Sequence, residues 1–334
     1  MPETSRGLQI GPIKLTNSVL LAPMSGISDL PFRRLARRLG AGLVISEMIA
    51  SEALAAGRDD TMLRAKGAEL NPFAIQLSGR EPRWMAEGAR IATSLGAQII
   101  DINMGCPAKQ VTRGLSGSAL MRDLDHALTL IDATVAATEL PVTLKMRMGW
   151  DHETLNAPEL AKRAEAAGVQ MITVHGRTRC QFFDGSADWR FIAKVKHAVT
   201  IPVIANGDVT SPDDASEILR HSTADGLMIG RGACGAPWLP GLAAKRLAGQ
   251  GASCPTLGER IELIKHHYDD ILCHYGRARG VRTARKHLAW YIDALASNVE
   301  QARRWRARIC RQDDPNLVRR ALAEFFDSTQ ELAA

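Results

Sequence analysis

Short apolar runs recur along the first two thirds of the chain, and each is followed by a polar or glycine-containing segment. We count eight such runs, rich in Val, Ile and Leu, at residues 19–21, 43–45, 73–77, 98–102, 142–146, 171–174, 202–205 and 226–229. Segments with the apolar spacing of amphipathic helices lie between the runs, for example 31–39, 84–95, 126–138 and 158–167. Because continuous hydrophobicity is typical of strands buried on both faces, this alternation predicts parallel strands joined by crossover helices.

The number of repeated units favours one parallel architecture over another. Eight strand–helix units within about 240 residues fit an α/β fold of the (β/α)8 type, the TIM barrel. The alternative is an open doubly wound sheet, which is disfavoured because no G-x-G-x-x-G segment opens the first predicted helix. The segment Ser211-Pro212-Asp213-Asp214 is typical of a helix start and supports the alternation. We therefore predict a catalytic barrel domain over residues 1–247.

The pattern changes after the small-residue linker 249–253. Thr256-Leu257-Gly258-Glu259 is a capping-box sequence, and apolar residues then recur at helical spacing as far as Tyr275. Further helical patterns cover residues 282–296, 301–310 and 317–326. These patterns predict a small all-α helical bundle over residues 256–334. Within it, Trp290 and Tyr291 are candidates either for the core or for stacking on nucleic-acid bases.

Polar or glycine-bearing groups stand at the end of every predicted strand. Because the carboxyl ends of barrel strands meet on one face, where active sites lie, these groups predict a ligand site. They are Pro23, Met24 and Ser25; Glu47; Gln76; Asn103 with Cys106; Lys145 with Arg147; His175 with Arg177; Asn206, Gly207 and Asp208; and Gly230 with Arg231.

Four of these strand ends carry specific chemistry. Cys106 lies between Gly105 and Pro107, where it either contacts a flat heterocycle or is a small buried residue in a tight turn. The glycine-containing segments 206–208 and 230–232 follow strands seven and eight, the usual place for a bound phosphate, and Arg231 can add a bidentate contact. Lys145 places a cation near the ligand, unless it pairs with Glu47.

The composition and the cysteine spacing limit the cellular compartments in which we expect the protein. The 334-residue chain has no apolar signal segment near Met1–Gly11 and no apolar run long enough to span a bilayer. Its six cysteines form no C-x-x-C pair or metal-finger spacing, so we expect a reduced cytoplasmic protein with no metal.

Positive charge is concentrated near the end of the chain. Net charge is +6, and residues 277–311 hold ten Lys and Arg against two acids. Such a cluster indicates either nucleic-acid binding or a solvated helix face. On a helix, Arg282, Arg285 and Lys286 share a face.

Several of the strand-end segments match a known family pattern. They are Ala22-Pro23-Met24, Ile75-Gln76-Leu77, 101–107, Leu144-Lys145, 174–179, 204–208 and 229–231. Together they resemble the tRNA-dihydrouridine synthases, and 282–291 resembles the C-terminal helical domain of the bacterial B-type branch. The resemblance covers nearly the whole chain. Gln110 and Gly114 depart from it, since we expect basic residues there.

The resemblance implies an FMN-dependent enzyme that reduces the C5–C6 double bond of uridine in tRNA to 5,6-dihydrouridine. NADPH, or NADH, would reduce the flavin, hydride would pass from its N5 to C6, and Cys106 would protonate C5. An ordinary thiol is mostly protonated at neutral pH and suits that role. The implied FMN contacts are Pro23, Met24, Ser25, Gln76, Lys145, His175, Asn206, Gly207, Asp208, Gly230 and Arg231. The implied substrate contacts are Asn103, Arg177, Arg179, Arg282, Arg285 and Lys286.

Two other functional classes stay open at this level. A flavin barrel acting on a free pyrimidine, in the manner of dihydroorotate dehydrogenases, would not need the basic helical segment. A non-catalytic RNA-binding protein would not need Cys106 and Lys145 together. The sequence therefore favours a tRNA-modifying enzyme, which we expect to be a monomer without membrane contact.

Overall fold

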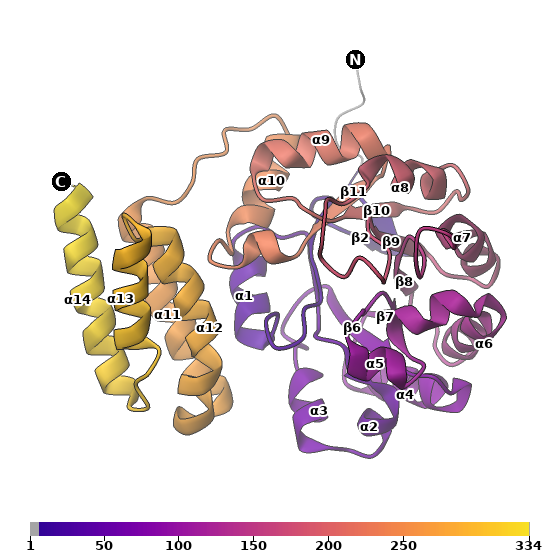
Figure 1. Ribbon diagram of the computed structural model, residues 1–334. Coiled ribbons are helices and arrows are strands. Elements are labelled where there is room, and N and C mark those ends of the chain that lie inside the picture. Colours follow the sequence, from indigo (N-terminus) through magenta and orange to yellow (C-terminus); the bar gives the residue numbers. More distant parts are fainter. Residues whose placement is uncertain (1–6, 334) are drawn as a thin grey trace.

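The eight apolar runs form the parallel strands of a closed barrel in the computed structural model, which describes residues 7–333 (Figure 1). The first and last barrel strands pair directly, Leu21 opposite Ile229, so the sheet closes on itself and is not an open doubly wound sheet. The barrel strands are β3 (Val19–Leu21), β4 (Leu43–Ile45), β6 (Phe73–Ser78), β7 (Ile99–Met104), β8 (Val142–Arg147), β9 (Met171–His175), β10 (Val203–Asn206) and β11 (Gly226–Ile229).

Helices surround the barrel, as the spacing predicts. Asp29 caps the first of them by accepting from the Phe32 N–H at 3.1 Å, and Ser211 begins α9 with a capping box. The barrel helices are α1 (Leu30–Arg38), α2 (Ser51–Ala55), α3 (Asp59–Arg64), α4 (Pro82–Ser94), α5 (Lys109–Arg113), α6 (Leu124–Val135), α7 (Ala157–Ala166), α8 (Trp189–Lys196), α9 (Pro212–Ser222) and α10 (Leu239–Leu247), with 3-10 turns η1 (Gly117–Arg122) and η2 (Arg231–Ala233). The sequence pattern missed α2 and α3, which follow the short strand β5 (Ile49–Ala50).

The amino-terminal end of the barrel is filled with apolar side chains. Strands β1 (Gln9–Ile10) and β2 (Ile13–Lys14) form an antiparallel ribbon. Ile10 is fully buried there in a cluster with Leu43 and Ile99, the first residues of two barrel strands. Because this end is packed, the open mouth of the barrel lies at the carboxyl ends of the strands.

The C-terminal region is the predicted helical bundle, built from α11 (Leu257–Tyr275), α12 (Arg277–Leu295), α13 (Val299–Ile309) and α14 (Pro315–Ala333). Thr256 closes the predicted capping box with Glu259. Helix α12 starts five residues before the predicted range because Gly276, at φ +75°, turns the chain directly after α11. Of the two roles considered for Tyr291, packing in the core is the one observed, because the side chain is only 3% exposed. Residues 1–6 of the predicted barrel domain and residue 334 of the bundle lie outside the described residues.

The bundle lies on one side of the barrel, nearest α1 (Figure 1). Arg34 of α1 pairs with Asp270 of α11 at 3.0 Å, and Arg279 of α12 pairs with Asp60 of α3 at 2.5 Å. The bundle is therefore held beside the β3–α1 connection, one of the segments that form the mouth.

Candidate active site at the mouth of the barrel

The carboxyl ends of the strands enclose a cavity of about 440 Å³, within the usual size range for a small-molecule site. Its apolar wall includes Ile27, Met48 and Pro107. Twelve of the expected site residues line it: Pro23, Met24, Ser25, Gln76, Asn103, Cys106, Lys145, His175, Asn206, Gly207, Gly230 and Arg231. The expected convergence of strand ends on one ligand-sized space is therefore present.

A chain of buried hydrogen bonds orients the loop that carries Cys106. The Asp101 carboxylate accepts from Thr143 Oγ1 and from Gln76 Nε2, each at 2.6 Å. Gln76 Oε1 then accepts from Asn103 Nδ2 at 2.8 Å, and Asn103 Oδ1 accepts the Cys106 N–H at 3.0 Å. Because Asp101 is fully buried, its pKa rises to about 6, mainly through desolvation. At neutral pH the ionised carboxylate can only accept hydrogen bonds, and this fixes the orientation of the Gln76 and Asn103 side-chain amides.

A second set of contacts holds Cys106 from the far side of its loop. Its carbonyl accepts from the Ser118 N–H at 3.1 Å and from Ser118 Oγ at 2.8 Å. Gly117, at φ +60°, makes this approach possible, since a Cβ atom there would lie 2.9 Å from the same carbonyl oxygen. Sequence reasoning missed both residues, although the adjacent Gly and Ser after a cysteine loop were a usable signal. Cys106 is partly exposed to the cavity.

Basic side chains dominate the electrostatics of the mouth. Burial, aided by the charge of nearby Arg147 and opposed by that of Asp101, lowers the pKa of Lys145 to about 8. Burial, followed by the charge of Arg147, pushes the pKa of His175 well below its ordinary value, so the imidazole is neutral. The Arg147 guanidinium donates to the carbonyls of Gly105, Thr178 and Phe182 at 2.7–2.9 Å and ties two mouth loops together.

Lys145 does not pair with Glu47. Its ammonium donates to Asn206 Oδ1 at 3.1 Å, whereas Glu47 accepts the Gly26 N–H at 2.5 Å. Asn206 also donates to the Met228 carbonyl at 2.8 Å, so it joins β8, β10 and β11. Gly207 follows at φ +127°, a conformation that favours glycine.

Arg177 and Asp208, expected to contact substrate and phosphate respectively, bind each other instead. Their bidentate ion pair has N–O distances of 2.8 and 2.7 Å, and the Arg177 guanidinium also donates to the carbonyls of Asp184 and Gly185. Arg177 is 2% exposed, and neither residue lines the cavity. The contacts with substrate and phosphate that we expected of these two residues stay predictions. The pair brings the loops after β9 and β10 together, and the two residues act by positioning these loops.

An aromatic pair in the loop after β9 was missed by sequence reasoning. Phe182 and Phe183 line the cavity, and Phe183 is 47% exposed. The Arg231 guanidinium lies 4.5 Å from the centre of the Phe183 ring, and that of Arg147 lies 5.5 Å away. An exposed aromatic flanked by two cations is a surface suited to a planar, electron-rich group. Two adjacent Phe residues in a chain with seven were the available signal.

The other expected substrate contacts lie outside the cavity. Arg179 lies over the rings of Trp150 and Phe182, and Arg285 pairs with Asp313 at 2.6 Å. Arg282 is exposed. Lys286 approaches the mouth, since a Cβ atom added to Gly26 would lie 3.5 Å from its ammonium. Arg285 and Lys286 on α12 therefore have different neighbours, and contact of these residues with tRNA stays a prediction.

Comparison with known proteins gives a consistent set of relatives. The family model described as dihydrouridine synthase matches residues 20–330. A Rhodobacter capsulatus protein named probable tRNA-dihydrouridine synthase is 52% identical over 95% of this chain and 98% of its own length. The tRNA-dihydrouridine synthase B of Xanthomonas axonopodis pv. citri is 43% identical over 96% of each chain.

Among solved structures, a complex of 2-naphthoyl-CoA reductase with 2-naphthoyl-CoA resembles this chain with a TM-score of 0.58. The match covers 73% of this chain and 52% of that one, so the chain spans about half the length of that structure. At 12% identity, this likeness shows the barrel fold alone. No helix among residues 7–333 has both the length and the apolar character needed to cross a membrane.

Proposed function

The chain belongs to the dihydrouridine synthase family, and from that premise we propose that it is a flavin-dependent tRNA-dihydrouridine synthase. It would reduce the C5–C6 double bond of uridines in tRNA with NADPH or NADH as the reductant. The observation that carries this proposal is the placement of a partly exposed Cys106 and a cationic Lys145 in one ligand-sized cavity.

The residues of the cavity fit FMN. Pro23 and Met24 offer an apolar surface to a flat ring, and the Lys145 ammonium is available to its electron-rich edge. Gly207 and Gly230 leave backbone open for a phosphate, and the half-exposed Arg231 can pair with it. When bound, reduced FMN supplies the hydride that adds to C6 of uracil.

The side chains of this protein would supply the proton and the orientation of the substrate. Cys106 would give its thiol proton to C5 and recover one from solvent. Asn103 uses one amide N–H on Gln76, so its second N–H stays available for a uracil carbonyl. The acceptor chain from Asp101 would hold both residues in place.

The substrate would be a uridine extruded from folded tRNA. A base must leave its stack to enter a cavity of this kind, and an exposed aromatic can receive it by stacking. Phe183, whose ring centre lies 4.5 Å from the Arg231 guanidinium and 5.5 Å from that of Arg147, would suit this role. Lys286 and the exposed Arg282 would contact phosphates farther along the tRNA. We propose that residues 1–247 hold the flavin and residues 256–334 bind tRNA.

The remaining expectations concern the state and location of the protein. All six cysteines are free thiols, which supports a reducing, cytoplasmic setting. A monomer remains our expectation.

The test is an assay with the purified protein, NADPH and unmodified tRNA. We expect a yellow protein that releases FMN on denaturation, and nucleosides that gain two hydrogens at uridine by mass spectrometry. Free uracil and uridine serve as controls and should react much more slowly. A protein that binds no FMN, or that reduces the free pyrimidine as fast as tRNA, would contradict the proposal.

A further inference from the structure

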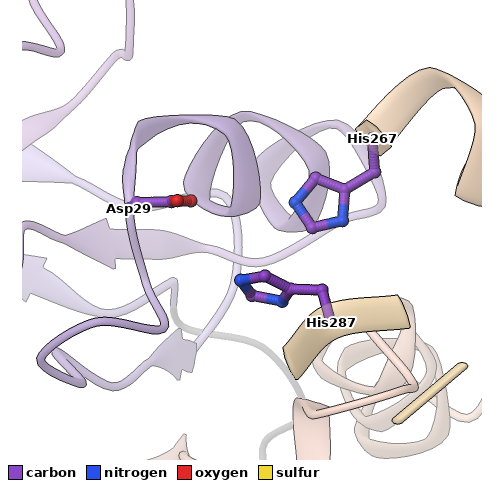
Figure 2. Close-up of side chains that lie close together, drawn as sticks. All are labelled: Asp29, His267 and His287. Atoms are coloured by element: carbon purple, nitrogen blue, oxygen red, sulfur yellow. The ribbon is translucent and has the colours of Figure 1, made fainter. Parts of the chain in front are cut away.

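Three side chains of the metal-ligand type meet where the bundle packs on the barrel. Asp29 stands at the start of α1, His267 lies on α11 and His287 on α12 (Figure 2). Each offers one ligand atom, and these atoms lie within 4.8 Å of one another. All three residues are at most 2% exposed. Figure 2 shows the three side chains directed into one common space.

Each of the three side chains has a buried polar atom without a hydrogen-bond partner, namely Asp29 Oδ2, His267 Nε2 and His287 Nε2. Asp29 caps α1 through its other oxygen, Oδ1, and the Tyr275 hydroxyl lies close enough to the carboxylate to lower its pKa. Within residues 7–333 no hydrogen bond joins these three side chains to each other. Because buried polar atoms in folded proteins are nearly always paired, three such atoms in one space indicate a missing common partner.

The chemistry of the cluster matches a divalent transition metal ion. Two imidazoles and one carboxylate are ligands that Zn²⁺ binds readily, with solvent in a fourth position. His267 Nδ1 lies 2.9 Å from the Tyr291 hydroxyl. If Nδ1–H donates to that oxygen, the lone pair of Nε2 is free for a metal, and the phenol orients the ring.

The surroundings also suit a metal. Phe32 packs on both imidazoles, with ring centres 5.7 Å from His267 and 5.3 Å from His287, and so helps to hold the two rings in place. The charge of Glu47 acts on Asp29 with the same sign as Asp29 itself, whereas Lys286 acts with the opposite sign. The carboxylates of Asp29 and Glu47 thus act beside the cations Arg33 and Lys286, so direct contact with Asp29, rather than the net charge of the surroundings, would favour a bound cation.

We propose that Asp29, His267 and His287 form a Zn²⁺ site that ties the helical bundle to the barrel. One ligand comes from the barrel and two from the bundle, so the ion fixes how the bundle sits beside the mouth. Asp29 follows Met24 and Ser25 in the same β3–α1 connection, which links the site to the cavity wall. The site does not depend on the reaction proposed above.

The experiment measures zinc on the flavin-loaded, full-length protein after equilibrium dialysis against micromolar Zn²⁺. We expect one zinc per chain by elemental analysis, and X-ray absorption with nitrogen and oxygen neighbours, imidazole included, and no sulfur. Zinc should raise the thermal midpoint of unfolding, and a chelator should lower it. His267→Gln and His287→Gln should lose the stoichiometric zinc, whereas His266→Gln, which changes the exposed neighbour on α11, should keep it.

Tyr291→Phe keeps the proposal testable if the ligand variants misfold. It leaves all three ligands intact and removes the hydrogen bond to His267, so zinc affinity should fall about 10- to 100-fold. Wild-type protein that takes up far less than one zinc per chain would overturn the site. Equal zinc binding by His266→Gln and the two ligand variants, or sulfur neighbours in the absorption spectrum, would overturn it as well.

Discussion

At the scale of single residues, the direction of hydrogen bonds determines where the thiol lies. Asp101 touches no part of the cavity, yet its carboxylate sets the orientation of Gln76, and Gln76 sets that of Asn103. Asn103 in turn accepts the N–H of Cys106. A buried acceptor three hydrogen bonds away therefore controls the geometry of the proposed proton donor.

Replacing Asp101 should test this control. Asp101→Ala leaves Gln76 Nε2 without its acceptor, so the amide can turn and the Cys106 loop loses its anchor. We expect the rate of dihydrouridine formation to fall about 10- to 100-fold, with FMN content unchanged. Asp101→Asn should restore most of the rate, because its carbonyl can accept from Gln76 while its amide donates to the Thr143 hydroxyl. Equal rates for the Ala variant and wild type would contradict the orienting role.

Asp101 should also affect how the stability of the folded protein depends on pH. Its pKa is about 6 in the folded protein against 3.8 for an ordinary aspartate carboxyl, so the folded state binds an extra proton between these values. The stability that this extra proton contributes is fully present below pH 3.8 and is lost as the pH rises through 6. The burial of the carboxylate then costs about 3 kcal/mol of unfolding free energy. We therefore expect the unfolding free energy of Asp101→Asn, relative to that of wild type, to increase between pH 4 and 6 and to stay roughly constant above pH 6. Urea unfolding at each pH measures this difference. A pH-independent difference would contradict this.

Cys106→Ala should separate the two halves of the reaction. Flavin binding and NADPH oxidation involve no proton from the thiol and should persist. Dihydrouridine formation should fall by a factor on the order of 10² or more, as expected for the loss of a positioned acid. Cys254→Ala, an exposed cysteine in the linker, is the matched control. Full activity of Cys106→Ala on unmodified tRNA would show that another group protonates C5.

At the scale of elements, the sequence predicts the strands and their ends well, but not the contacts between loops. The eight barrel strands are confirmed because strands buried on both faces leave an unbroken apolar signal. The crossover with β5, α2 and α3 was not predicted, since these are short and partly exposed elements. The Arg177–Asp208 pair joins the loops after two different strands, and a linear sequence shows each charge but not its partner.

The loop after β10 gives a prediction at this scale. A Cβ atom on Gly207 would lie 2.6 Å from the Ala187 Cβ and 3.2 Å from His175 Cδ2, at a φ of +127°. Gly207→Ala should therefore distort the loop, at a cost of about 1–3 kcal/mol, and weaken FMN binding at least about tenfold. Gly251→Ala is the control, because nothing lies within 4 Å of its added Cβ. Fluorescence titration with FMN measures both, and equal affinities would contradict a role for this loop in holding the phosphate.

At the scale of the whole molecule, the barrel and bundle are joined by contacts that composition does not reveal. The basic region is visible in the sequence, but the structure divides its arginines into two groups. Arg285 and Arg306 pair with Asp313 and Asp293 at 2.6 and 3.1 Å, whereas Arg282 and Arg304 are exposed and lack such a partner in residues 7–333. The net charge therefore predicts that this region binds a polyanion, and the structure shows which arginines have no carboxylate partner in the described part of the chain and are available to bind it.

This division predicts an uneven response of tRNA binding to salt. An arginine that neutralises a phosphate releases a counterion, so Arg282→Gln and Arg304→Gln should each lower the slope of log affinity against log salt by about one. Arg285→Gln and Arg306→Gln should change the slope less, because these arginines already face a carboxylate. FMN content and NADPH oxidation should stay at wild-type values in all four, since both belong to the barrel. If all four bind tRNA with wild-type affinity and slope, the positive cluster is a solvated surface, and tRNA docks elsewhere on the protein.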